Sequence, residues 1–328
     1  MPGRARWRIG GAAVGLAVVV ALVVALGPST IAARLSEVGA GFVWVLAAYL
    51  AALVLYAMPL GVVLPPPLRP PLRALVASRF GAVAVNAATP LFGLGGEPVR
   101  LLWIRRDERR PAAAALAIDR GAFLGASALF LLFGVAVALW RLSLPRAIQL
   151  ALTALALVAL AGAAALYLWQ RRGLLAPLAA LVARVAPARG SRLRARADEI
   201  DDHIRSLHRD GRRRFTAAVA LHLAGRFASI AEVAVAARLL HLPLPATGAL
   251  ILTALPLALD LAFSMVPSQL GLHEGATALL ATALGLDPAS GLALAFLQRL
   301  RQIVFVTIGF TLITTRRNKV QSSTSSNA

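Results

Sequence analysis

The chain of 328 residues contains no cysteine. This absence excludes disulfide bridges, thiolate nucleophiles, cysteine-bound zinc and iron–sulfur clusters. Aromatic residues make up only 6% of the chain and charged residues only 15%, whereas apolar residues reach 59%. A soluble domain is usually about 45–50% apolar and about 25% charged. The composition therefore predicts an integral membrane protein rather than a soluble domain.

Acidic residues are also scarce, with 14 Asp and Glu against 34 Lys and Arg and a formal net charge of +20. An excess of this sign is typical of proteins that bind nucleic acid. Here, however, the arginines gather in short loops between apolar runs, and no aromatic residues interleave with them. We therefore expect no nucleic-acid partner.

Long apolar runs are what the chain has in abundance. A helix needs about 20 residues to cross roughly 30 Å of hydrocarbon, at about 1.5 Å per residue. Runs of about this length lie at 9–26, 42–64, 111–140, 147–170, 215–240 and 289–315. A cleaved signal peptide is the alternative for the first run, but its apolar part exceeds the roughly 7 to 15 residues of a signal sequence. We predict an all-α membrane protein with about six transmembrane helices, and a disordered polar tail at 318–328.

Basic residues predict the orientation of the chain in the membrane. They crowd the amino terminus, the loops 65–73 and 104–110, the segment 171–214 and the end of the chain. The alternate loops hold only Arg34, Arg141 and Arg146. Cytoplasmic loops carry such an excess of Lys and Arg, so both termini are expected in the cytoplasm, with the chain in a bacterial inner membrane. Segment 171–214 is then a basic cytoplasmic loop.

Two further apolar segments, 74–103 and 248–286, each connect loops that are expected on one side of the membrane. Neither segment is long enough for two crossings and a turn, so each is expected to enter the bilayer and return as a re-entrant helical hairpin. Proline and glycine residues interrupt the middle of both segments, as expected at a hairpin tip. The first hairpin is expected to open to the cytoplasm and the second to the outer side.

The two hairpins share a pattern in which a Pro is followed seven residues later by a Glu and then by an Arg on the next helix. The two sets are Pro90, Glu97 and Arg120, and Pro267, Glu274 and Arg299. Because the two halves run in opposite senses, the pattern predicts an inverted 3+3 repeat, an architecture common in transporters. The first repeat occupies residues 1–170, within which helix 147–170 already opens the second. The rest of the second repeat occupies 215–317.

The residues around the hairpins resemble a known family. The stretch from Asn86 to Arg120, with Thr89-Pro90, Gly95-Gly96-Glu97 and Arg100, is similar to the signature of the lysylphosphatidylglycerol synthase transmembrane region, a flippase-like family. Later positions match as well: Pro267, Gly271, Glu274 and Arg299. The chain is most similar to stand-alone members, including those encoded with hopanoid biosynthesis genes. Larger members add a cytosolic aminoacyl-transferase domain that has no counterpart here, so lysyl-lipid synthesis is not implied.

Ionised side chains in the middle of a bilayer cost about 2.5–3.5 kcal/mol each, so they normally pair or line a wet cavity. Arg120 and Arg299 lie about ten residues into their helices, near mid-depth, where two guanidinium groups can hold a lipid phosphate. Glu97 and Glu274 are expected to pair with them when no substrate is bound, and Glu97 can also pair with Arg100 one turn away. The alternative is a set of closed Glu–Arg pairs that only pin the hairpins together.

The candidate substrate-binding residues are Asn86, Thr89, Pro90, Gly95, Gly96, Glu97, Arg100, Arg120, Pro267, Gly271, Glu274 and Arg299. Four supporting polar residues accompany them, with Asp119 and Asp260 expected as partners of Arg226 and Glu232. His222 and His273 are interpreted as polar core residues rather than metal ligands. We expect no metal, no cofactor and no catalytic residue.

These features favour a transporter that moves an anionic or isoprenoid-type lipid between leaflets. Its substrate would be a phospholipid, a polyprenyl phosphate or a hopanoid-type lipid. The alternative is a membrane-embedded lipid-modifying enzyme, or an accessory subunit of hopanoid or glycolipid biosynthesis. Such an enzyme needs an acid, base or nucleophile cluster, for which the sequence offers only scattered candidates. The chain has no Walker motif, so we do not expect ATP hydrolysis to drive transport directly. A homo-oligomer and partner biosynthetic enzymes both stay open.

Overall fold

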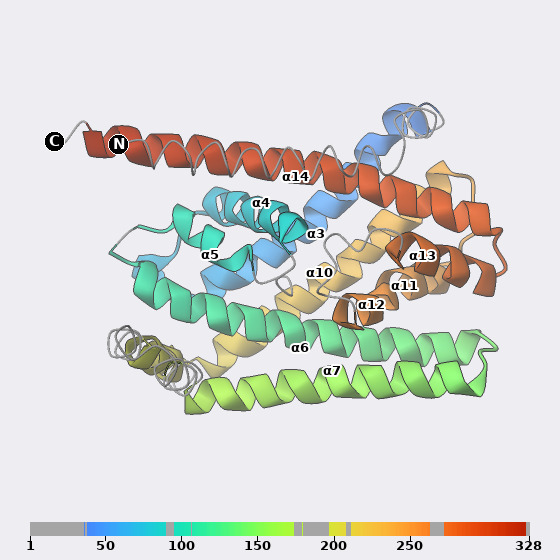
Figure 1. The fold of residues 1–328 in the computed structure, drawn as a ribbon, viewed down its shortest axis with the longest axis horizontal. Coiled ribbons are helices and arrows are strands. Elements are labelled where there is room, and N and C mark those ends of the chain that lie inside the picture. The colour runs from blue at the N-terminus through green and yellow to red at the C-terminus, as the bar shows by residue number, and fades with distance from the viewer. Residues whose placement is uncertain are drawn as a thin grey trace.

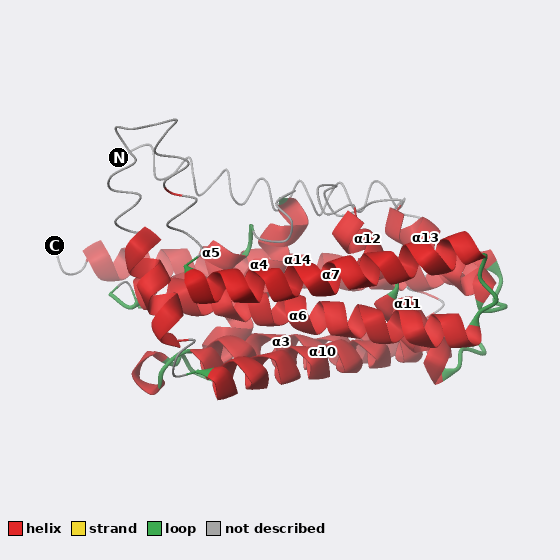
Figure 2. Cartoon of the chain, turned by 90° about the horizontal axis from the view of Figure 1, so that it is seen from below, coloured by secondary structure: helices red, strands yellow, loops and turns green. Residues whose placement is uncertain are grey.

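The computed structural model describes residues 36, 38–89, 95–105, 107–173, 179, 197–207, 211–262 and 272–325. Within them it leaves out the side chains of 260–262, 272 and 319–325. Every regular element of the described chain is a helix, as predicted (Figures 1 and 2).

Among the described residues, five helices are long and apolar enough to cross a membrane. They are α3 (Phe42–Val63, preceded by the short helix η1 at Gly39–Gly41), α6 (Arg109–Arg141), α7 (Arg146–Arg172), α10 (Arg212–Leu239) and α14 (Pro288–Ser325). These helices coincide with five of the six predicted spans. The remaining predicted span, 9–26, lies outside the described residues.

Proline and glycine residues mark where several helices begin and end. Pro145 and Pro245 immediately precede α7 and α11 (Ala246–Ala254), and Pro288 is the first residue of α14. Proline is tolerated at a helix start because the first N–H groups have no partner within the helix. Gly173 follows α7 with a positive φ of 102°, a conformation that favours glycine.

The long helices form layers around a central pair (Figure 1). Helices α3 and α10 cross the middle of the molecule diagonally and pack against each other, with α14 on one side and α6 and α7 on the other. The interfaces rely on small residues. A Cβ atom at Gly225 of α10 would lie 2.6 Å from the Tyr56 ring of α3, and one at Gly309 of α14 would lie 2.4 Å from the Phe80 carbonyl oxygen. Close approach over small residues is typical of helix pairs in membranes.

The outer surface of the bundle is apolar. Helix α7 buries only Ala156 and Gln170, while Leu150 and Val158 are each 63% exposed. Exposed apolar area of this extent is unfavourable in water but is satisfied by lipid chains. The described chain therefore has the surface of a multi-pass membrane protein.

Both segments predicted as hairpins consist of interrupted helices. The first contains α4 (Leu72–Ala88), then α5 (Glu97–Arg100) and the 3-10 helix η3 (Leu101–Trp103), both of which contact α4. The second contains α11, α12 (Pro256–Ala262) and α13 (Leu272–Ala283). The break between α11 and α12 was not predicted. It lies at Leu255, where Pro256 has no N–H to continue the helix. The predicted tips, with Pro90, Pro267 and Gly271, lie outside the described residues.

Basic side chains are distributed unequally between the two ends of the bundle. The left end of Figure 1 contains the α3–α4 and η3–α6 connections, the end of α7, the start of α10 and the end of α14. The described basic residues at this end are Arg69, Arg73, Arg105, Arg109, Arg110, Arg171, Arg172, Arg205, Arg212, Arg213, Arg214, Arg316 and Arg317. Those near the opposite end are Arg141, Arg146 and Arg238. The loops that the sequence grouped by charge are thus also grouped in space.

Candidate functional site

Arg120 and Arg299 occupy corresponding depths in two helices that begin at opposite ends of the bundle. Each follows the first residue of its helix, Arg109 or Pro288, by eleven positions. This separation corresponds to about 16 Å, roughly half the thickness of a hydrocarbon core. Figure 1 shows α6 beginning at the left and α14 at the right. Both arginines thus lie about equally far from the starts of their helices, and their position at the middle of the bilayer stays a prediction.

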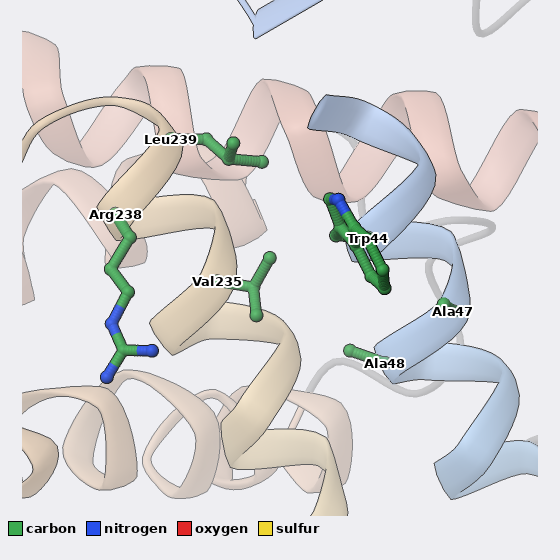
Figure 3. A pocket seen from close by; sticks show the side chains of 6 residues that line it. All are labelled: Trp44, Ala47, Ala48, Val235, Arg238 and Leu239. Atoms are coloured by element: carbon green, nitrogen blue, oxygen red, sulfur yellow. The ribbon is translucent and has the colours of Figure 1, made fainter. Parts of the chain in front are cut away.

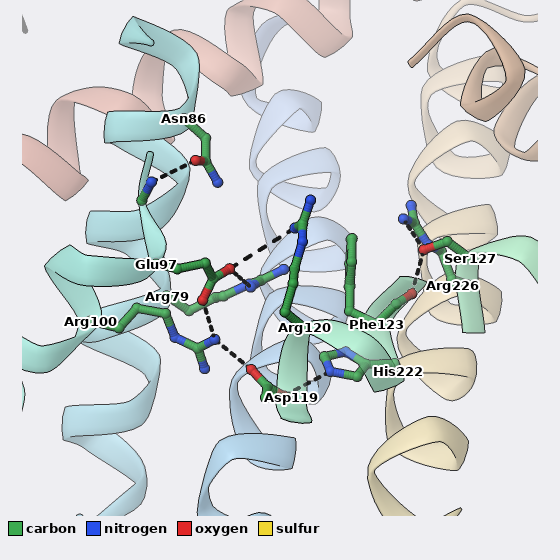
Figure 4. A network of polar contacts seen from close by, with 11 residues as sticks. Arg79, Asn86, Glu97, Arg100, Asp119, Arg120, Phe123, Ser127, His222 and Arg226 are labelled. Carbon is green, nitrogen blue, oxygen red and sulfur yellow. Dashed lines mark hydrogen bonds and ion pairs between the residues drawn. The ribbon is translucent and has the colours of Figure 1, made fainter. Parts of the chain in front are cut away.

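Glu97, the first residue of α5, lies among three arginines (Figure 4). Arg100 donates a hydrogen bond from Nη1 to Glu97 Oε2 at 3.0 Å, which confirms the predicted local pair. Nη1 of Arg120 lies 4.0 Å from Glu97 Oε1, so the predicted pairing with Arg120 also forms, although more loosely. Arg79 of α4 approaches the same oxygen at 3.8 Å. Sequence reasoning missed Arg79, although an arginine inside an apolar hairpin segment is itself an indication of function.

The residues before Glu97 determine where it lies. Asn86 Oδ1 accepts a hydrogen bond from the Gly96 N–H at 2.7 Å, which ties the start of α5 to α4. A Cβ atom at Gly96 would lie 2.2 Å from the Ala82 carbonyl oxygen, so only glycine permits this approach. Thr89 ends α4, and its hydroxyl donates to the Val85 carbonyl at 2.8 Å. Asn86, Thr89 and Gly96 thus position Glu97, and their direct contact with a substrate stays a prediction.

Asp119 is a buried carboxylate of the same cluster. Its Oδ2 accepts a hydrogen bond from Arg100 Nη1 at 2.5 Å, and its Oδ1 lies 2.9 Å from His222 Nε2. The prediction that Asp119 pairs with Arg226 or Glu232 is wrong. On α6, Asp119 faces α5 and His222, whereas Arg226, one turn beyond His222 on α10, donates to Ser127 at 2.7 Å. The interpretation of His222 as a polar core residue is confirmed by its 0% exposure and this contact.

An aromatic ring lies at the centre of the arginines. The guanidinium carbons of Arg79, Arg120 and Arg226 lie 5.3, 5.1 and 4.8 Å from the centroid of the Phe123 ring. The guanidinium carbons of Arg79 and Arg226 also each lie 5.7 Å from the centroid of the Tyr56 ring of α3. Cation–π contacts within about 6 Å partly compensate buried guanidinium groups for lost hydration. Neither ring was predicted, because an aromatic residue in an apolar run has no distinguishing pattern.

A second cluster contains the repeat-related pair. Arg299 Nε donates to Glu274 Oε1 at 2.5 Å, and its Nη2 donates to Oε2 at 3.3 Å, so the predicted pairing is bidentate. His273 Nε2 lies 2.7 Å from Gln298 Oε1. Glu232 accepts a hydrogen bond from Arg301 at 2.9 Å. Its partner is therefore Arg301, and the prediction that Asp119 is its partner is wrong. The Asp260 side chain, like Pro267 and Gly271, lies outside the described residues.

Other features of the described chain give weaker candidates. The groove between α3 and α10 near the right end of the bundle has a volume of about 390 Å³ (Figure 3). Trp44, Val235, Arg238 and Leu239 are among the residues that line it. Within the described chain, no three His, Asp or Glu side chains gather as a metal site. The chemistry available in this structure is therefore concentrated in the Glu97 and Glu274 clusters.

Comparison with family models matches residues 10–309 to one described as the lysylphosphatidylglycerol synthase TM region. Comparisons with curated proteins and with solved structures gave no match. The matched residues include both clusters and nearly the whole membrane part. The chain therefore belongs to the family of the lysylphosphatidylglycerol synthase TM region.

Proposed function

We propose that this protein moves a lipid with an anionic head group between the leaflets of a bacterial inner membrane. The observation that carries the proposal is the recurrence of a Glu–Arg pair at corresponding depths in α6 and α14, which begin at opposite ends of the bundle. Membership of a family whose description refers to a lipid product supports a lipid as the substrate.

In this proposal, α4 with α5 and η3, and α11 with α12 and α13, are re-entrant hairpins of an inverted 3+3 repeat. Their positions toward opposite ends of the bundle in Figure 1 support that arrangement. The end rich in arginine faces the cytoplasm, which places the carboxyl-terminal end of α14 there. The lipid head group then enters the protein beside one hairpin and leaves it beside the other. The acyl or isoprenoid chains stay in the surrounding lipid.

The geometry around Glu97 suits exchange between a protein carboxylate and a lipid phosphate. Arg79 and Arg120 lie 3.8 and 4.0 Å from Glu97, beyond the usual range of about 2.7–3.2 Å for a hydrogen bond. A phosphate that offers shorter, charge-assisted hydrogen bonds can displace this loose contact at little cost. Arg100 keeps its buried bond to Asp119 during the exchange, so the cluster does not have to come apart.

The proposal is tested in vesicles that contain the purified protein and a fluorescent anionic phospholipid. We expect Arg120→Gln and Glu274→Gln each to slow redistribution between leaflets by about 10- to 100-fold, as the loss of a hydrogen bond to a charged group implies. The exposed Arg141, at the end of α6, provides the matched control Arg141→Gln, which should transport normally.

Two results contradict the proposal. One is unchanged transport in Arg120→Gln and Glu274→Gln at equal protein content. The other is a new covalent lipid product, detected by mass spectrometry, that depends on this protein alone. That product would favour a lipid-modifying enzyme.

A further inference from the structure

His222 is a buried titratable group that the proposed transport does not yet use. It lies on α10 with no exposed surface, and its Nε2 atom is 2.9 Å from Asp119 Oδ1 on α6. The other oxygen of the same carboxylate accepts a hydrogen bond from Arg100. A carboxylate that is paired with an arginine is ionised and can only accept hydrogen bonds. Nε2 of His222 must therefore carry the hydrogen of its contact with Asp119.

The second ring nitrogen of His222 is then a proton acceptor. In a neutral imidazole whose Nε2 carries the hydrogen, Nδ1 has a free lone pair. Nδ1 of His222 has no hydrogen-bond partner in the part of the chain that the structure describes. A buried polar atom without a partner costs about 1–3 kcal/mol, so it calls for an explanation. A proton added to this lone pair would turn the contact between His222 and Asp119 into a charge-assisted ion pair.

Three consecutive contacts connect His222 to the carboxylate of the proposed substrate site (Figure 4). His222 contacts Asp119 at 2.9 Å, and Asp119 accepts from Arg100 Nη1 at 2.5 Å. The same Nη1 atom donates to Glu97 Oε2 at 3.0 Å. Groups in a buried polar network polarise one another, because the surrounding dielectric constant is low. A change of charge on His222 is therefore transmitted to Glu97, where the lipid head group is proposed to exchange.

The groups around His222 have opposite effects on its protonation. The titratable and charged side chains that act on it or lie one turn away on α10 are Asp119, Tyr56, Arg79, Arg100 and Arg226. Burial and the positive charges of Arg79 and Arg100 oppose a proton on the imidazole, whereas Asp119 favours it. An anionic head group that binds beside Arg79 offsets part of this repulsion. Binding of the lipid thus favours a proton on His222.

We infer that His222 takes up a proton at Nδ1 when an anionic lipid binds, so that the proton is a second ligand of the transporter. This inference rests on the proposed function and adds the coupled ion to it. The proton comes from the solvent and adds to the Nδ1 lone pair, while the Nε2–H stays with Asp119, so no other bond forms or breaks. Coupling between two ligands is reciprocal, so a lower pH also tightens lipid binding.

The test counts the protons that the purified full chain takes up in detergent, and it does not depend on transport. The probe is a short-chain phosphatidylglycerol, because its phosphodiester does not itself titrate near neutral pH. Isothermal titration calorimetry in two buffers with different ionisation enthalpies gives the number of protons taken up per lipid bound. We expect uptake of at most about one proton per lipid. As the pH falls from about 8 to about 5, the range in which histidine titrates, the affinity should rise by up to about tenfold per pH unit.

The variant His222→Gln separates proton uptake from the hydrogen bond. The glutamine amide can still donate to Asp119, but it does not take up a proton near neutral pH. We expect this variant to bind the lipid without proton uptake and with an affinity that does not change with pH. The matched control is His241→Asn, at an exposed histidine between α10 and α11. Asparagine readily adopts the positive φ of 55° at this position, so the control should keep normal proton uptake.

The outcomes separate this inference from the proposed function. Lipid binding without proton uptake by the unaltered protein overturns the inference, whether or not His222→Gln folds, and leaves the transport proposal standing. Uptake that persists in His222→Gln also overturns it and points to another group, such as Glu97. Uptake that depends on His222 in a protein that moves no lipid supports the inference and contradicts the transport proposal. A protein that binds no anionic lipid contradicts both.

Discussion

At the scale of single residues, Arg100 is a fully buried charge. Its side chain is 0% exposed and contacts both Glu97 and Asp119. Its Nε and Nη2 atoms have no hydrogen-bond partner in the described part of the chain. The Glu97–Arg100 pair is predictable, since three residues separate its members on one helix turn. The Arg100–Asp119 bond joins two elements, so no local spacing could predict it.

Removal of Arg100 should destabilise the protein rather than only inactivate it. Arg100→Gln leaves Asp119 buried without its ion-pair partner, a loss of about 3–5 kcal/mol for comparable buried pairs. We expect a lower melting temperature in detergent and less folded protein in the membrane. The double variant Arg100→Gln with Asp119→Asn removes both charges and should recover much of the loss. A single variant as stable as the unaltered protein would show that the pair contributes little.

At the scale of elements, the interrupted helices carry the candidate site. The sequence indicates the interruption after α4, because a proline and three glycines follow it closely. It does not indicate that the return segment α5 packs directly on α4, with Gly96 against the backbone of Ala82. This contact fixes Glu97 relative to Arg79 of α4. It depends on the separation between two chain segments, which only the folded structure determines.

A methyl group at Gly96 should therefore disturb the site. Gly96→Ala forces α5 away from α4, an overpacking that typically costs about 1–3 kcal/mol. We expect a lower melting temperature and slower lipid movement, measured on the same preparation. The matched control is Gly125→Ala in α6, where an added Cβ meets no atom within 4 Å, and it should leave both quantities essentially unchanged. Equal behaviour of the two variants would argue against close packing of α5 on α4.

At the scale of the whole molecule, the charge asymmetry between the two ends predicts the orientation. The natural absence of cysteine makes this directly testable, because any introduced cysteine is the only one. Asp107 lies in the connection before α6, and Ser143 lies in the connection between α6 and α7. Both residues are exposed, and α6 separates them by the thickness of a membrane.

An impermeant maleimide should label the two positions from opposite sides. In intact cells we expect Ser143→Cys to react and Asp107→Cys to stay unlabelled until the membrane is permeabilised. A third variant, Arg317→Cys at the end of α14, should behave like Asp107→Cys. Labelling of Asp107→Cys in intact cells would reverse the proposed orientation. Labelling of both positions from one side would mean that α6 does not cross.

The sequence alone determined the fold class, the five candidate spans that the structure describes, and the separation of basic from less basic loops. These properties follow from composition and run length, because lipid admits only chain segments that satisfy their own backbone hydrogen bonds. Local spacing also identified the Glu97–Arg100 pair, and the repeated Pro, Glu and Arg pattern indicated the Glu274–Arg299 pair. Only the tertiary structure decided the other partners. Three arginines from α4, α6 and α10 meet at Phe123 because the helices converge there, and Asp119 selects Arg100 and His222 because of the face of α6 that it occupies. Contacts between residues far apart in the chain depend on helix packing, which a one-dimensional pattern does not encode.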